Sequence, residues 1–494
     1  MTATTSSSLS GAVPRFALLP VGTAVLTLGV TLAATLGQYG YHRDELYFRM
    51  LPLQWGYTDQ PPLTPLIEHM MTAISDQLWV LRLPALLFAL ASTVIIALIT
   101  REVGGGAWAQ GLAAWGYAFG ALTLVGGHVL LTASFDLMVW PAVMFAIIRA
   151  QLRHKPAWWL LAGAIAGISM YNKLLIAFLL VALLAGIVAV GPRSLLRSGW
   201  LYGAVGVMLL VGLPNLIYQA VNGWPQLAMG AALSSDNGSN VRVLVVPFLV
   251  LLLGPTLVPF WIAGIVALFR RPGWRSIRFI GIAFPVLVVL VFLAGSQYYY
   301  PFGLEAVVFA IGCVPVADFA RRSRLRAGVV VAAVAINVPL VTMISLPLIP
   351  VQIVGATPIP TINQTQRDQI GWQQYVHQVD AVAASLPDTD VIIFTSNYGE
   401  AGALARFGAR DQPAVFSAHN ALWNLGPPPA SASTAIVVGE QYDQVKAFFG
   451  SCTVKARLDN GVGVRNEEQG QPVAICTGRN TSWKQIWPQL RHLG

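Results

Sequence analysis

The chain has few charged residues and very few cysteines. Asp, Glu, Lys and Arg make up 10% of its 494 residues, against about 25% in an ordinary soluble protein. Hydrophobic residues make up 55%. A single soluble core stops growing beyond about 250–300 residues, so this much apolar sequence does not fit one soluble domain. The composition also excludes disorder and coiled coil, and it predicts a polytopic α-helical membrane protein.

Three cysteines are too few for a disulfide framework or a cysteine-based zinc site. Cys313 lies in an apolar run and is expected to serve packing. Cys452 and Cys476 lie in the polar C-terminal part, and whether they form a disulfide depends on whether that part faces an oxidising compartment. Only 5 of the 30 basic residues are lysines, a bias that indicates a high-GC bacterial genome.

Apolar runs long enough for membrane helices recur along the first 350 residues. A bilayer needs about 20 apolar residues per helix. We expect about 11 spans, with the run at 158 short enough to be half of a re-entrant pair. The runs begin near Phe16, Leu83, Ala107, Thr132, Trp158, Leu174, Gly199, Leu244, Phe279, Phe302 and Ala327.

The charges between these runs predict an orientation. Cytoplasmic loops are enriched in Lys and Arg. If the N-terminus is cytoplasmic, most basic residues fall in the cytoplasmic connections, namely Arg101, Arg149, Arg153, Lys155, Arg193, Arg197, Arg270, Arg271, Arg275, Arg278, Arg321, Arg322, Arg324 and Arg326. The net charge of +9 is therefore a topology signal, and no nucleic-acid partner is expected. The first run is interpreted as an uncleaved anchor, because it exceeds the length of a signal-peptide core and only Arg15 precedes it as a basic residue.

Carboxylates show the opposite distribution. Only Glu102 and Asp318 fall on the cytoplasmic side of the membrane region. The outer side holds Asp44, Glu45, Asp59, Glu68, Asp76, Asp136, Asp236 and Glu305. The positive-inside rule does not concern acids, so this clustering predicts a polar site that opens outward.

The connection between the first two runs, residues 38–81, is long for a membrane protein. It contains a carboxylate pair, Asp44-Glu45, and then the segment Trp55-Gly-Tyr-Thr-Asp-Gln-Pro-Pro-Leu63. Apolar residues from Leu63 to Leu78 recur with helical spacing and predict an amphipathic helix, either flat in the membrane interface or packed on the polar C-terminal part. Adjacent carboxylates at a membrane boundary are either functional or a helix cap, with Asp44 capping a helix that starts at Glu45.

These residues carry a resemblance to a known family. Asp44-Glu45 followed by an aromatic pair, then Trp-Gly-Tyr-x-Asp-x-Pro-Pro-Leu with Tyr57 and Asp59, is similar to the first-loop signature of the GT-C glycosyltransferases. Within them it resembles the protein O-mannosyltransferase and lipid A aminoarabinose transferase group (glycosyltransferase family 39-like). Arg82-Leu-Pro, and the segment Ser396-Asn-Tyr-Gly-Glu-Ala-Gly-Ala-Leu404, resemble the group as well.

The resemblance implies a reaction. Members of this group transfer a sugar, with inversion, from a polyprenyl-phosphate carrier to an acceptor hydroxyl at the outer face of the membrane. Phosphate is a good leaving group, so one carboxylate that accepts the hydroxyl proton suffices. Asp44 matches the catalytic position, and Glu45 is expected to hold either the acceptor or Asp44. Asp136, at the outer start of the fourth run, fits a second acidic position of the family; the alternative is a cap of that helix.

The carrier phosphate requires cations or donors at the same face. Lys173 is the first candidate, with an interfacial lysine as the alternative. Arg82 is the second candidate or else an interfacial anchor. Tyr298 and Tyr299 resemble a tyrosine-containing stretch near the carrier phosphate of family members. There a Lys or Arg often precedes the tyrosines, whereas Gln297 stands here, so an aromatic belt remains the alternative for them.

No cofactor is expected. The resemblance leaves open a divalent ion held by Asp44, Glu45 and Asp136, as in more distant GT-C oligosaccharyltransferases. The histidines have no metal-ligand spacing. The glycines at 104–106 form a cytoplasmic turn, and the lack of a phosphate-cradling glycine loop is consistent with a lipid-linked donor.

From about residue 357 the composition becomes that of a soluble domain. We expect two domains: 1–355, the GT-C membrane domain with 38–81 as its catalytic first outer loop, and 356–494, an extracytoplasmic α/β domain. Helices are expected over 366–385, 400–407 and 441–449, and strands over 390–395, 414–417 and 434–438. Asn397, Tyr398 and Glu400, with His419, Asn420 and Trp423, lie at strand ends, where α/β domains bind ligands. They are expected to shape acceptor access, or else to form a structural lid.

The sequence therefore predicts a polyprenyl-phospho-sugar-dependent hexosyl- or pentosyltransferase in the bacterial cytoplasmic membrane. Its partners are the lipid-linked donor, membrane lipids, and a protein, lipid or polysaccharide acceptor. Two alternatives stay open. A transporter or flippase would place carboxylates and broken helices at the midplane within inverted repeats, and no internal repeat is evident. The other alternative is a non-catalytic glycan-binding member of the same fold.

Overall fold

The computed structural model describes residues 13–386 and 390–494, which form two compact units. The first contains residues up to 34, 82–128 and 132–345, and the second contains 35–81, 129–131 and 346–494. Each unit is described by itself. The predicted boundary at 355 remains a prediction. The part of the anchor interpretation that rests on residues 1–12 lies outside the described residues.

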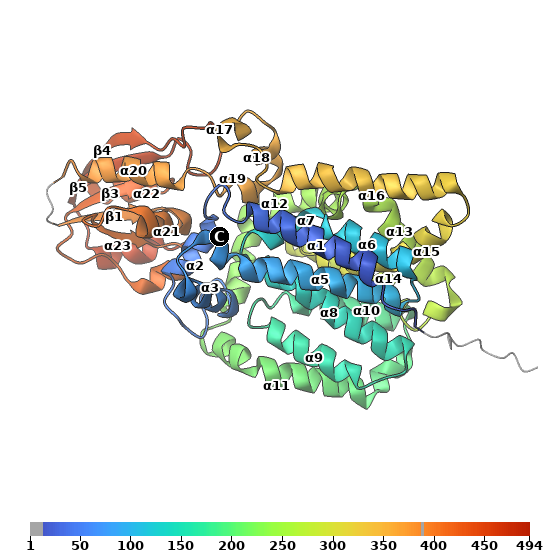
Figure 1. Ribbon diagram of the computed structural model, residues 1–494. Helices are drawn as coiled ribbons and strands as arrows, with labels where there is room; N and C mark the ends of the chain where they lie inside the picture. The colour runs from blue at the N-terminus through green and yellow to red at the C-terminus, as the bar shows by residue number, and fades with distance from the viewer. Residues whose placement is uncertain (1–12, 387–389) are drawn as a thin grey trace, which may run out of the picture. The chain divides into compact units, whose positions relative to one another are not determined.

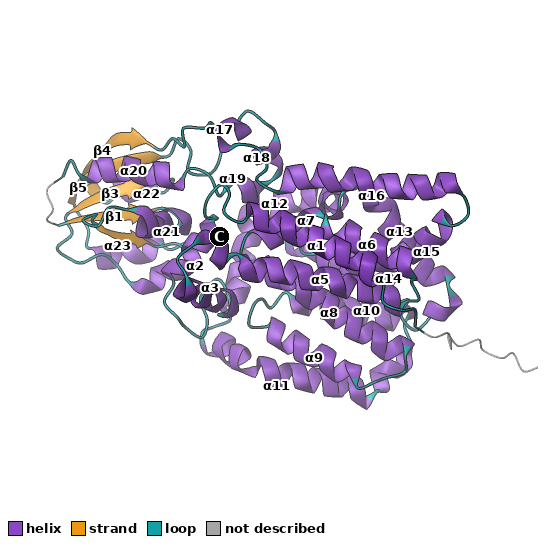
Figure 2. Cartoon of the chain, in the orientation of Figure 1, coloured by secondary structure: helices purple, strands orange, loops and turns teal. Residues whose placement is uncertain are grey.

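The first unit is a bundle of apolar helices (Figures 1 and 2). In the described part of the chain, seven helices are long and apolar enough to cross a membrane and four shorter apolar helices accompany them, which confirms a multi-pass membrane protein. The main helices are α1 (Leu18–Thr35), α5 (Leu83–Glu102), α6 (Ala107–Ala118), α7 (Ala121–His128), α8 (Thr132–Leu152), α9 (Trp158–Ser169), α10 (Ile176–Val190), α11 (Gly199–Val221), α12 (Pro225–Leu253), α13 (Val258–Arg270), α14 (Ile280–Ala294), α15 (Phe302–Ala320) and α16 (Arg324–Ser345). Short 3-10 turns, η1 (Arg193–Arg197), η2 (Pro255–Leu257) and η3 (Pro272–Trp274), join some of them.

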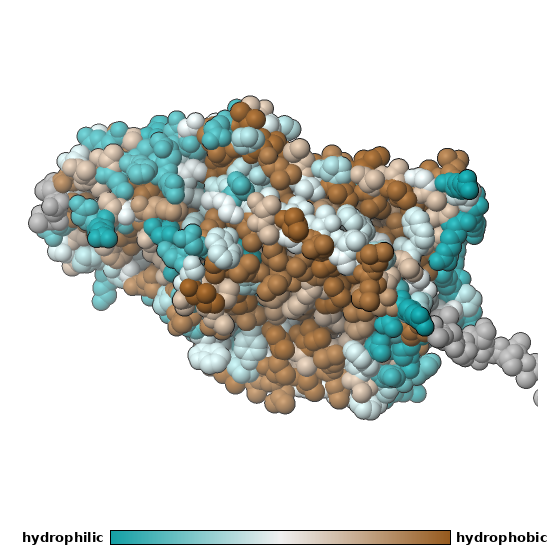
Figure 3. Space-filling model, in the orientation of Figure 1, coloured by the Kyte–Doolittle hydropathy of each residue, from teal (hydrophilic) through white to brown (hydrophobic). Residues whose placement is uncertain are grey.

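The basic connections contact one another at one end of this bundle. The guanidinium groups of Arg149 and Arg153 pair with Glu102, and Arg271 pairs with Asp318 at 2.6 Å. Figure 3 shows hydrophilic side chains at this end and an apolar surface along the helices. The side chains predicted to share the cytoplasmic side therefore do share one end of the bundle, which we call the basic end.

Two expected single runs are broken. The run at 107 is divided at Phe119–Gly120 into α6 and α7, and the run at 244 ends as α12 at Leu253. Buried Asn337 of α16 joins both breaks: its Nδ2 donates to the Leu253 carbonyl at 2.9 Å and to the Phe119 carbonyl at 3.4 Å. Gly254 has φ +113°, and a Cβ there would lie 2.0 Å from Asn337 Oδ1. A neighbouring helix thus satisfies the carbonyls that an interruption exposes in an apolar interior.

The second unit contains a mixed five-stranded sheet of order β2-β1-β3-β5-β4 (Figure 2). β1 pairs in parallel with β2 and β3, while β5 pairs antiparallel with β3 and β4. The strands are β1 (Val391–Thr395), β2 (Ala414–Ser417), β3 (Thr434–Val438), β4 (Phe449–Arg457) and β5 (Pro472–Arg479). Alternate strand residues Ile392, Phe394 and Val437 pack with Trp483 and Trp487 of α23 (Trp483–Leu490). The predicted α/β character is confirmed, although β4, β5 and α23 were not expected.

Cys452 and Cys476 lie directly opposite each other on β4 and β5 and form a disulfide. This settles for the structure the question that the sequence left open. Cys313 is free and buried in α15, as expected of a packing residue.

Helices of the second unit lie around the sheet and in the first-loop segment. They are α2 (Arg43–Met50), α3 (Leu63–Ile74), α4 (Leu78–Leu81), α17 (Val351–Val354), α18 (Ile359–Ile362), α19 (Gln364–Arg367), α20 (Trp372–Ala383), α21 (Tyr398–Phe407), α22 (Tyr442–Lys446) and the turn η4 (Asn420–Leu425). The amphipathic helix α3 keeps Leu66, Met70 and Ile74 exposed on one side while Glu68 is buried. An exposed apolar stripe is what placement in the membrane interface requires.

Candidate functional site

The carboxylate pair of the first loop opens α2, and its two members have different environments. The helix is capped by His42, not by Asp44: the Asp44 amide donates to His42 Nδ1 at 3.1 Å, and the His42 amide donates to Glu45 Oε2 at 2.8 Å. Glu45 is fully buried, and its Oε1 accepts from the Leu130 amide at 3.0 Å. Of the two predicted roles for Glu45, the structure therefore favours holding the turn that carries Asp44.

Asp44 is the member of the pair that remains accessible. Its side chain is 31% exposed. Its Oδ1 accepts a hydrogen bond of 2.9 Å from the hydroxyl of Tyr398. Among the described residues no hydrogen bond to Oδ2 is formed, so one carboxylate oxygen is fixed by Tyr398 and the other has no hydrogen-bond partner in a side chain that is partly exposed. This is the arrangement that a general base needs in order to accept a proton.

Close packing of α2 on α21 brings Tyr398 to Asp44. A Cβ at Gly402 would lie 2.6 Å from the Leu46 carbonyl, and a Cβ at Gly399 would lie 2.8 Å from the Trp372 ring and 3.1 Å from Arg43. Only glycines at these two positions allow the helices to approach this closely. The first loop is thereby seated on the helix that follows β1.

Two hydrogen-bonded pairs, Tyr398–Asp44 and Tyr47–Asp59, lie side by side. The Tyr47 hydroxyl donates to Asp59 Oδ1 at 2.8 Å, and it accepts from the Ala421 amide at 3.1 Å. The Tyr47 and Tyr398 rings lie 4.7 Å apart. Burial raises the pKa of Asp59 to about 7, although the hydrogen bond from Tyr47 works against that rise. Asp59, predicted as an acceptor-loop residue, is thus tied to the same cluster as Asp44.

Charged and aromatic groups hold Tyr398 on its other sides. The Arg43 guanidinium lies 4.8 Å from the centre of the Tyr398 ring and pairs with Glu467. The Tyr398 amide donates to His419 Nδ1 at 3.3 Å, and burial lowers the pKa of His419 well below its usual value, which keeps the imidazole neutral. Asp44, Tyr398, Arg43, His419, Tyr47 and Asp59 are called the Asp44 cluster below.

The remaining predicted acceptor residues serve the local fold. Asn397 Oδ1 accepts from the Glu400 amide at 2.9 Å, and Glu400 Oε2 accepts from the Ser396 and Asn397 amides, which forms a capping box at the start of α21. Burial raises the pKa of Glu400 well above its usual value. The buried Tyr57 donates its hydroxyl to the Pro52 carbonyl at 2.8 Å and closes the loop after α2. Asn397 and Glu400 orient Tyr398, and Tyr57 shapes the loop that contains Asp59.

A second cluster lies in the first unit, at the end of the helices opposite the basic end. Asp136, in the first turns of α8, accepts from Asn172 Nδ2 at 3.1 Å, and the same Nδ2 donates to the Thr132 carbonyl at 2.8 Å. The next residue, Lys173, lies close enough to Asp136 for their charges to interact. The structure therefore brings together a predicted catalytic carboxylate and the first candidate for phosphate binding.

The tyrosine triplet borders this cluster. Lys173 Nζ lies 5.8 Å from the centre of the Tyr299 ring and 5.0 Å from that of Tyr300. Tyr298 lies against Phe248 with ring centres 3.9 Å apart and ring planes tilted by 40°. Tyr299 and Tyr300 thus lie beside a cation that Lys173 supplies, whereas the residue that precedes the tyrosines in the chain, Gln297, carries no charge. We call Asp136, Asn172, Lys173, Tyr299 and Tyr300 the Lys173 cluster.

Arg82, the second candidate for binding the carrier phosphate, lies in the first unit. It is fully buried at the start of α5, with its guanidinium Nη1 3.3 Å from His128 Nε2. The expected alternative, an interfacial anchor, is wrong because the side chain is enclosed by protein.

The sequence did not single out Tyr47, Arg43 or His419 as part of one cluster. Tyr47 follows Asp44 by three positions, so helical spacing places both on neighbouring parts of one face. His419 was expected at a strand end, but no pattern in the sequence linked it or Arg43 to Asp44. No group of three or more His, Cys, Asp or Glu side chains arranged for a metal ion occurs in the described ranges.

The chain is similar in sequence to one protein family and in structure to solved membrane proteins. Residues 59–218 match the family model described as dolichyl-phosphate-mannose-protein mannosyltransferase. The structure is similar to crystal structures of ArnT from Cupriavidus metallidurans. The form bound to undecaprenyl phosphate has 15% identity and a TM-score of 0.56 over 93% of this chain and 97% of that one. The apo form has 14% identity and a TM-score of 0.51 over 96% and 98%. No curated protein sequence matches the chain.

The chain therefore shares the fold of the ArnT structures, in agreement with the expected GT-C fold class with a C-terminal α/β part. Its predicted resemblance to the mannosyltransferase and ArnT-like group is confirmed by the family model and by the fold. The model match contains Asp59, Arg82, Asp136 and Lys173, and it begins after Asp44.

Proposed function

We propose that the protein is an inverting glycosyltransferase that transfers a sugar from a polyprenyl-phosphate carrier to an acceptor hydroxyl. The observation that carries the proposal is the Asp44 cluster, in which the accessible carboxylate is fixed through one oxygen by Tyr398. The GT-C fold supports the class of reaction, and the ArnT structure with undecaprenyl phosphate supports the class of donor.

In the proposed reaction Asp44 Oδ2 accepts the proton of the acceptor hydroxyl. The hydroxyl oxygen attacks the anomeric carbon from the face opposite the phosphate and forms the new glycosidic bond. The bond between the anomeric carbon and the phosphate oxygen breaks, and its electrons leave on the polyprenyl phosphate. Attack from the opposite face inverts the configuration. No general acid is needed, because the departing phosphate is stable as an anion.

We assign binding of the departing phosphate to the Lys173 cluster. Lys173 supplies the positive charge, while Asn172 and Asp136 fix the chain on which it lies. A lysine ammonium binds phosphate as a point charge with three donors. Tyr299 and Tyr300, next to the ammonium, restrict its position by cation–π contact.

We further propose a bacterial cytoplasmic membrane location with the basic end in the cytoplasm and the α/β part outside. The gathering of basic connections at one end supports this orientation. The Cys452–Cys476 disulfide supports an oxidising surrounding for the α/β part. Thiol labelling of intact cells tests it: a cysteine introduced as Ser323→Cys between α15 and α16 should stay protected from an impermeant reagent, and Ser433→Cys next to β3 should be labelled.

The experiment that tests the function measures release of polyprenyl phosphate. Purified full-length protein receives a panel of polyprenyl-phospho-sugars and a crude envelope acceptor, and Asp44→Asn runs beside the wild type. Asp443→Asn, a carboxylate on α22 paired with Lys446, is the matched control. We expect acceptor-dependent release by the wild type and the control, and a loss of at least about 100-fold in Asp44→Asn.

Equal release by Asp44→Asn and wild type would remove Asp44 as the base. No release from any donor, by protein that unfolds cooperatively on heating, would contradict the transferase proposal as a whole. The sugar that supports release also identifies the donor, and mass analysis of the labelled acceptor distinguishes protein, lipid and polysaccharide.

A further inference from the structure

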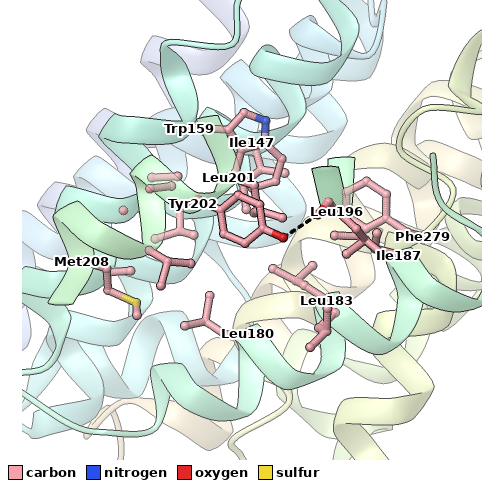
Figure 4. A pocket seen from close by; sticks show the side chains of 17 residues that line it. Ile147, Trp159, Leu180, Leu183, Ile187, Leu196, Leu201, Tyr202, Met208 and Phe279 are labelled. Atoms are coloured by element: carbon pink, nitrogen blue, oxygen red, sulfur yellow. Dashed lines mark hydrogen bonds between the residues drawn. The ribbon is translucent and has the colours of Figure 1, made fainter. Parts of the chain in front are cut away.

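An apolar cavity lies inside the first unit, and none of its lining residues belongs to the Lys173 cluster. Its volume is about 350 Å³, within the range of about 300–1,000 Å³ that is usual for small-molecule sites. Residues of α8, α9, α10, α11 and η1 line it together with Phe279, which precedes α14, and they include Ile147, Trp159, Leu183 and Met208 (Figure 4). Tyr202 is the polar side chain with a hydrogen bond there, and it donates its hydroxyl to the Leu196 carbonyl at 2.7 Å. The lining therefore fits a hydrocarbon and offers little to a polar ligand.

The cavity lies near the basic end of the bundle. Its lining residues Ile187, Leu196 and Phe279 adjoin connections that contain Arg193, Arg197 and Arg278. The Arg278 guanidinium donates to the Val190 carbonyl, which ties two of these connections together. Lys173, by contrast, precedes the other end of α10. A molecule in this cavity would therefore have its nearest basic groups at the end opposite the Lys173 cluster.

The cavity is open at the surface of the bundle between α10 and α11. Its lining residues Leu184 and Val205 are 52% and 43% exposed. In a membrane such a surface faces the lipid chains. If the cavity were empty, the side chains that line it would lack van der Waals contacts on one side. A lipid chain that enters from the side would supply these contacts.

The charges beside the cavity indicate the kind of lipid. Arg193 and Arg197, in the turn η1 at its margin, are exposed, and neither pairs with a carboxylate within the described ranges. Basic pockets of this type between membrane helices attract anionic head groups. Two guanidinium groups beside an apolar cavity complement a lipid with a phosphate at one end and a hydrocarbon chain at the other.

We propose that this cavity binds one acyl chain of an anionic phospholipid, with the lipid phosphate at Arg193 and Arg197. The site is separate from donor binding, because the phosphate of the donor is assigned to the opposite end of the bundle. The bound chain completes the packing between α9, α10 and α11. The lipid is thus a structural ligand of the leaflet that faces the basic end.

Photo-crosslinking tests the proposal without any variant. The full-length protein is placed in nanodiscs of phosphatidylcholine that contain a small fraction of a lipid with a diazirine in its acyl chain, either phosphatidylglycerol or phosphatidylcholine. We expect phosphatidylglycerol to label peptides within 158–208 at least about fivefold more than phosphatidylcholine does. Equal labelling by the two lipids would overturn the proposal. So would a diazirine polyprenyl phosphate that labels these peptides more strongly than phosphatidylglycerol.

Two pairs of variants locate the lipid. Val205→Trp fills the cavity, and Leu209→Trp is its control, since Leu209 lies one turn further along α11, is 44% exposed and does not line the cavity. Arg193→Gln with Arg197→Gln removes the charges, and Arg322→Gln with Arg324→Gln is the control in another basic connection. We expect labelling by phosphatidylglycerol to fall at least about fivefold in Val205→Trp and in the first arginine pair only. Undiminished labelling in either of these variants would overturn the assignment.

Discussion

The hydroxyl of Tyr398 donates a hydrogen bond of 2.9 Å to Oδ1 of Asp44, across 354 positions of the sequence. Both residues lie near the start of a helix, Asp44 in α2 and Tyr398 in α21. The capping boxes of His42 with Glu45 and of Asn397 with Glu400 fix these two helix starts. The geometry of the proposed base is therefore set in part by these four polar side chains at the starts of α2 and α21.

Tyr398→Phe is the first prediction, since Tyr398 is a positioning residue. The variant removes the hydrogen bond to Asp44 and keeps the ring between Tyr47, Arg43 and His419. A hydrogen bond to a charged group contributes about 1.5–3 kcal/mol, so we expect kcat to fall roughly 10- to 100-fold. Because Tyr398 does not hold the donor in this proposal, KM for the donor should change little. Steady-state kinetics measures kcat and KM separately, and Tyr442→Phe on α22 is the control. A rise in KM with unchanged kcat would contradict the positioning role.

Lys173→Gln is expected to act on donor affinity. Loss of the ammonium removes the proposed charge for the carrier phosphate, so KM for the polyprenyl-phospho-sugar should rise at least about 10-fold, and Lys173→Arg should recover part of that loss. Lys155→Gln, at the other end of α9, is the matched control. Initial rates measured over a range of donor concentrations give the KM of each variant. An unchanged KM in Lys173→Gln would leave this lysine as an interfacial residue.

The neighbouring carboxylates Asp44 and Glu45 should separate function from stability. In the wild type, each carboxylate oxygen of Glu45 accepts a hydrogen bond from one backbone amide. Glu45→Gln leaves a single acceptor oxygen for the two amides, and an unsatisfied buried group costs about 1–3 kcal/mol. We expect a lower unfolding temperature for Glu45→Gln. Asp44→Asn should unfold at the wild-type temperature and lose activity. Thermal unfolding in detergent, followed alongside the release assay, tests both. The reverse pattern would show that the two roles are assigned to the wrong residues.

The membrane region and the parallel part of the sheet could be predicted from the sequence because both depend on local patterns. Apolar runs gave the helices. The short, continuous apolar run of β1, rich in β-branched residues, predicted a strand buried on both faces, and Ile392, Ile393 and Phe394 are all buried. β4 was missed because most of its residues are exposed, so it lacks an apolar face. The helix expected up to residue 449 ends at Lys446, where the chain turns into β4 at Phe449.

The site could be predicted only in part. Resemblance identified Asp44, and the strand-end rule identified the neighbourhood of Tyr398. Their pairing depends on Gly399 and Gly402, which allow α2 and α21 to approach. Such a contact between distant segments leaves no periodic signal in either segment. The breaks at Gly120 and Gly254 were missed for the same reason, since the side chain that satisfies them, Asn337, lies on another helix.

A pH dependence of stability follows from Asp59. Burial raises its pKa to about 7 from an ordinary value of 3.8. The folded state then binds the proton more tightly than the unfolded state, so this contribution to stability is fully present below about pH 4 and is lost as the pH rises to about 7. We expect the free energy of unfolding to fall by roughly 2 kcal/mol between pH 5 and pH 7 on account of Asp59. Glu68 and Glu468, whose pKa burial also raises to about 7, add to the fall.

Asp59→Asn isolates this effect, since the amide oxygen still accepts the hydrogen bond from Tyr47. The variant should show a smaller fall of unfolding temperature between pH 5 and pH 7 than the wild type, whereas the exposed Asp411→Asn should follow the wild type. Thermal unfolding at half-unit steps of pH measures both. A slope as steep in Asp59→Asn as in the wild type would mean that other groups account for the pH dependence.

Loss of the Cys452–Cys476 disulfide is expected to destabilise the α/β part. Cys452 and Cys476 close a loop across 24 positions, for which chain entropy gives a stabilisation of about 3 kcal/mol. Both sulfurs join the antiparallel pair β4–β5, and Cys476 is part of the core that α23 covers. We therefore expect reduction, or the double change Cys452→Ser with Cys476→Ser, to lower the unfolding temperature of the α/β part. Cys313→Ala should leave the response to reductant unchanged, because this thiol is buried in α15 and unbonded to sulfur. Proteolysis of the full-length protein with and without reductant reports the change through faster cleavage between 446 and 490. Equal cleavage rates in the two conditions would show that sheet pairing alone holds β4 in place.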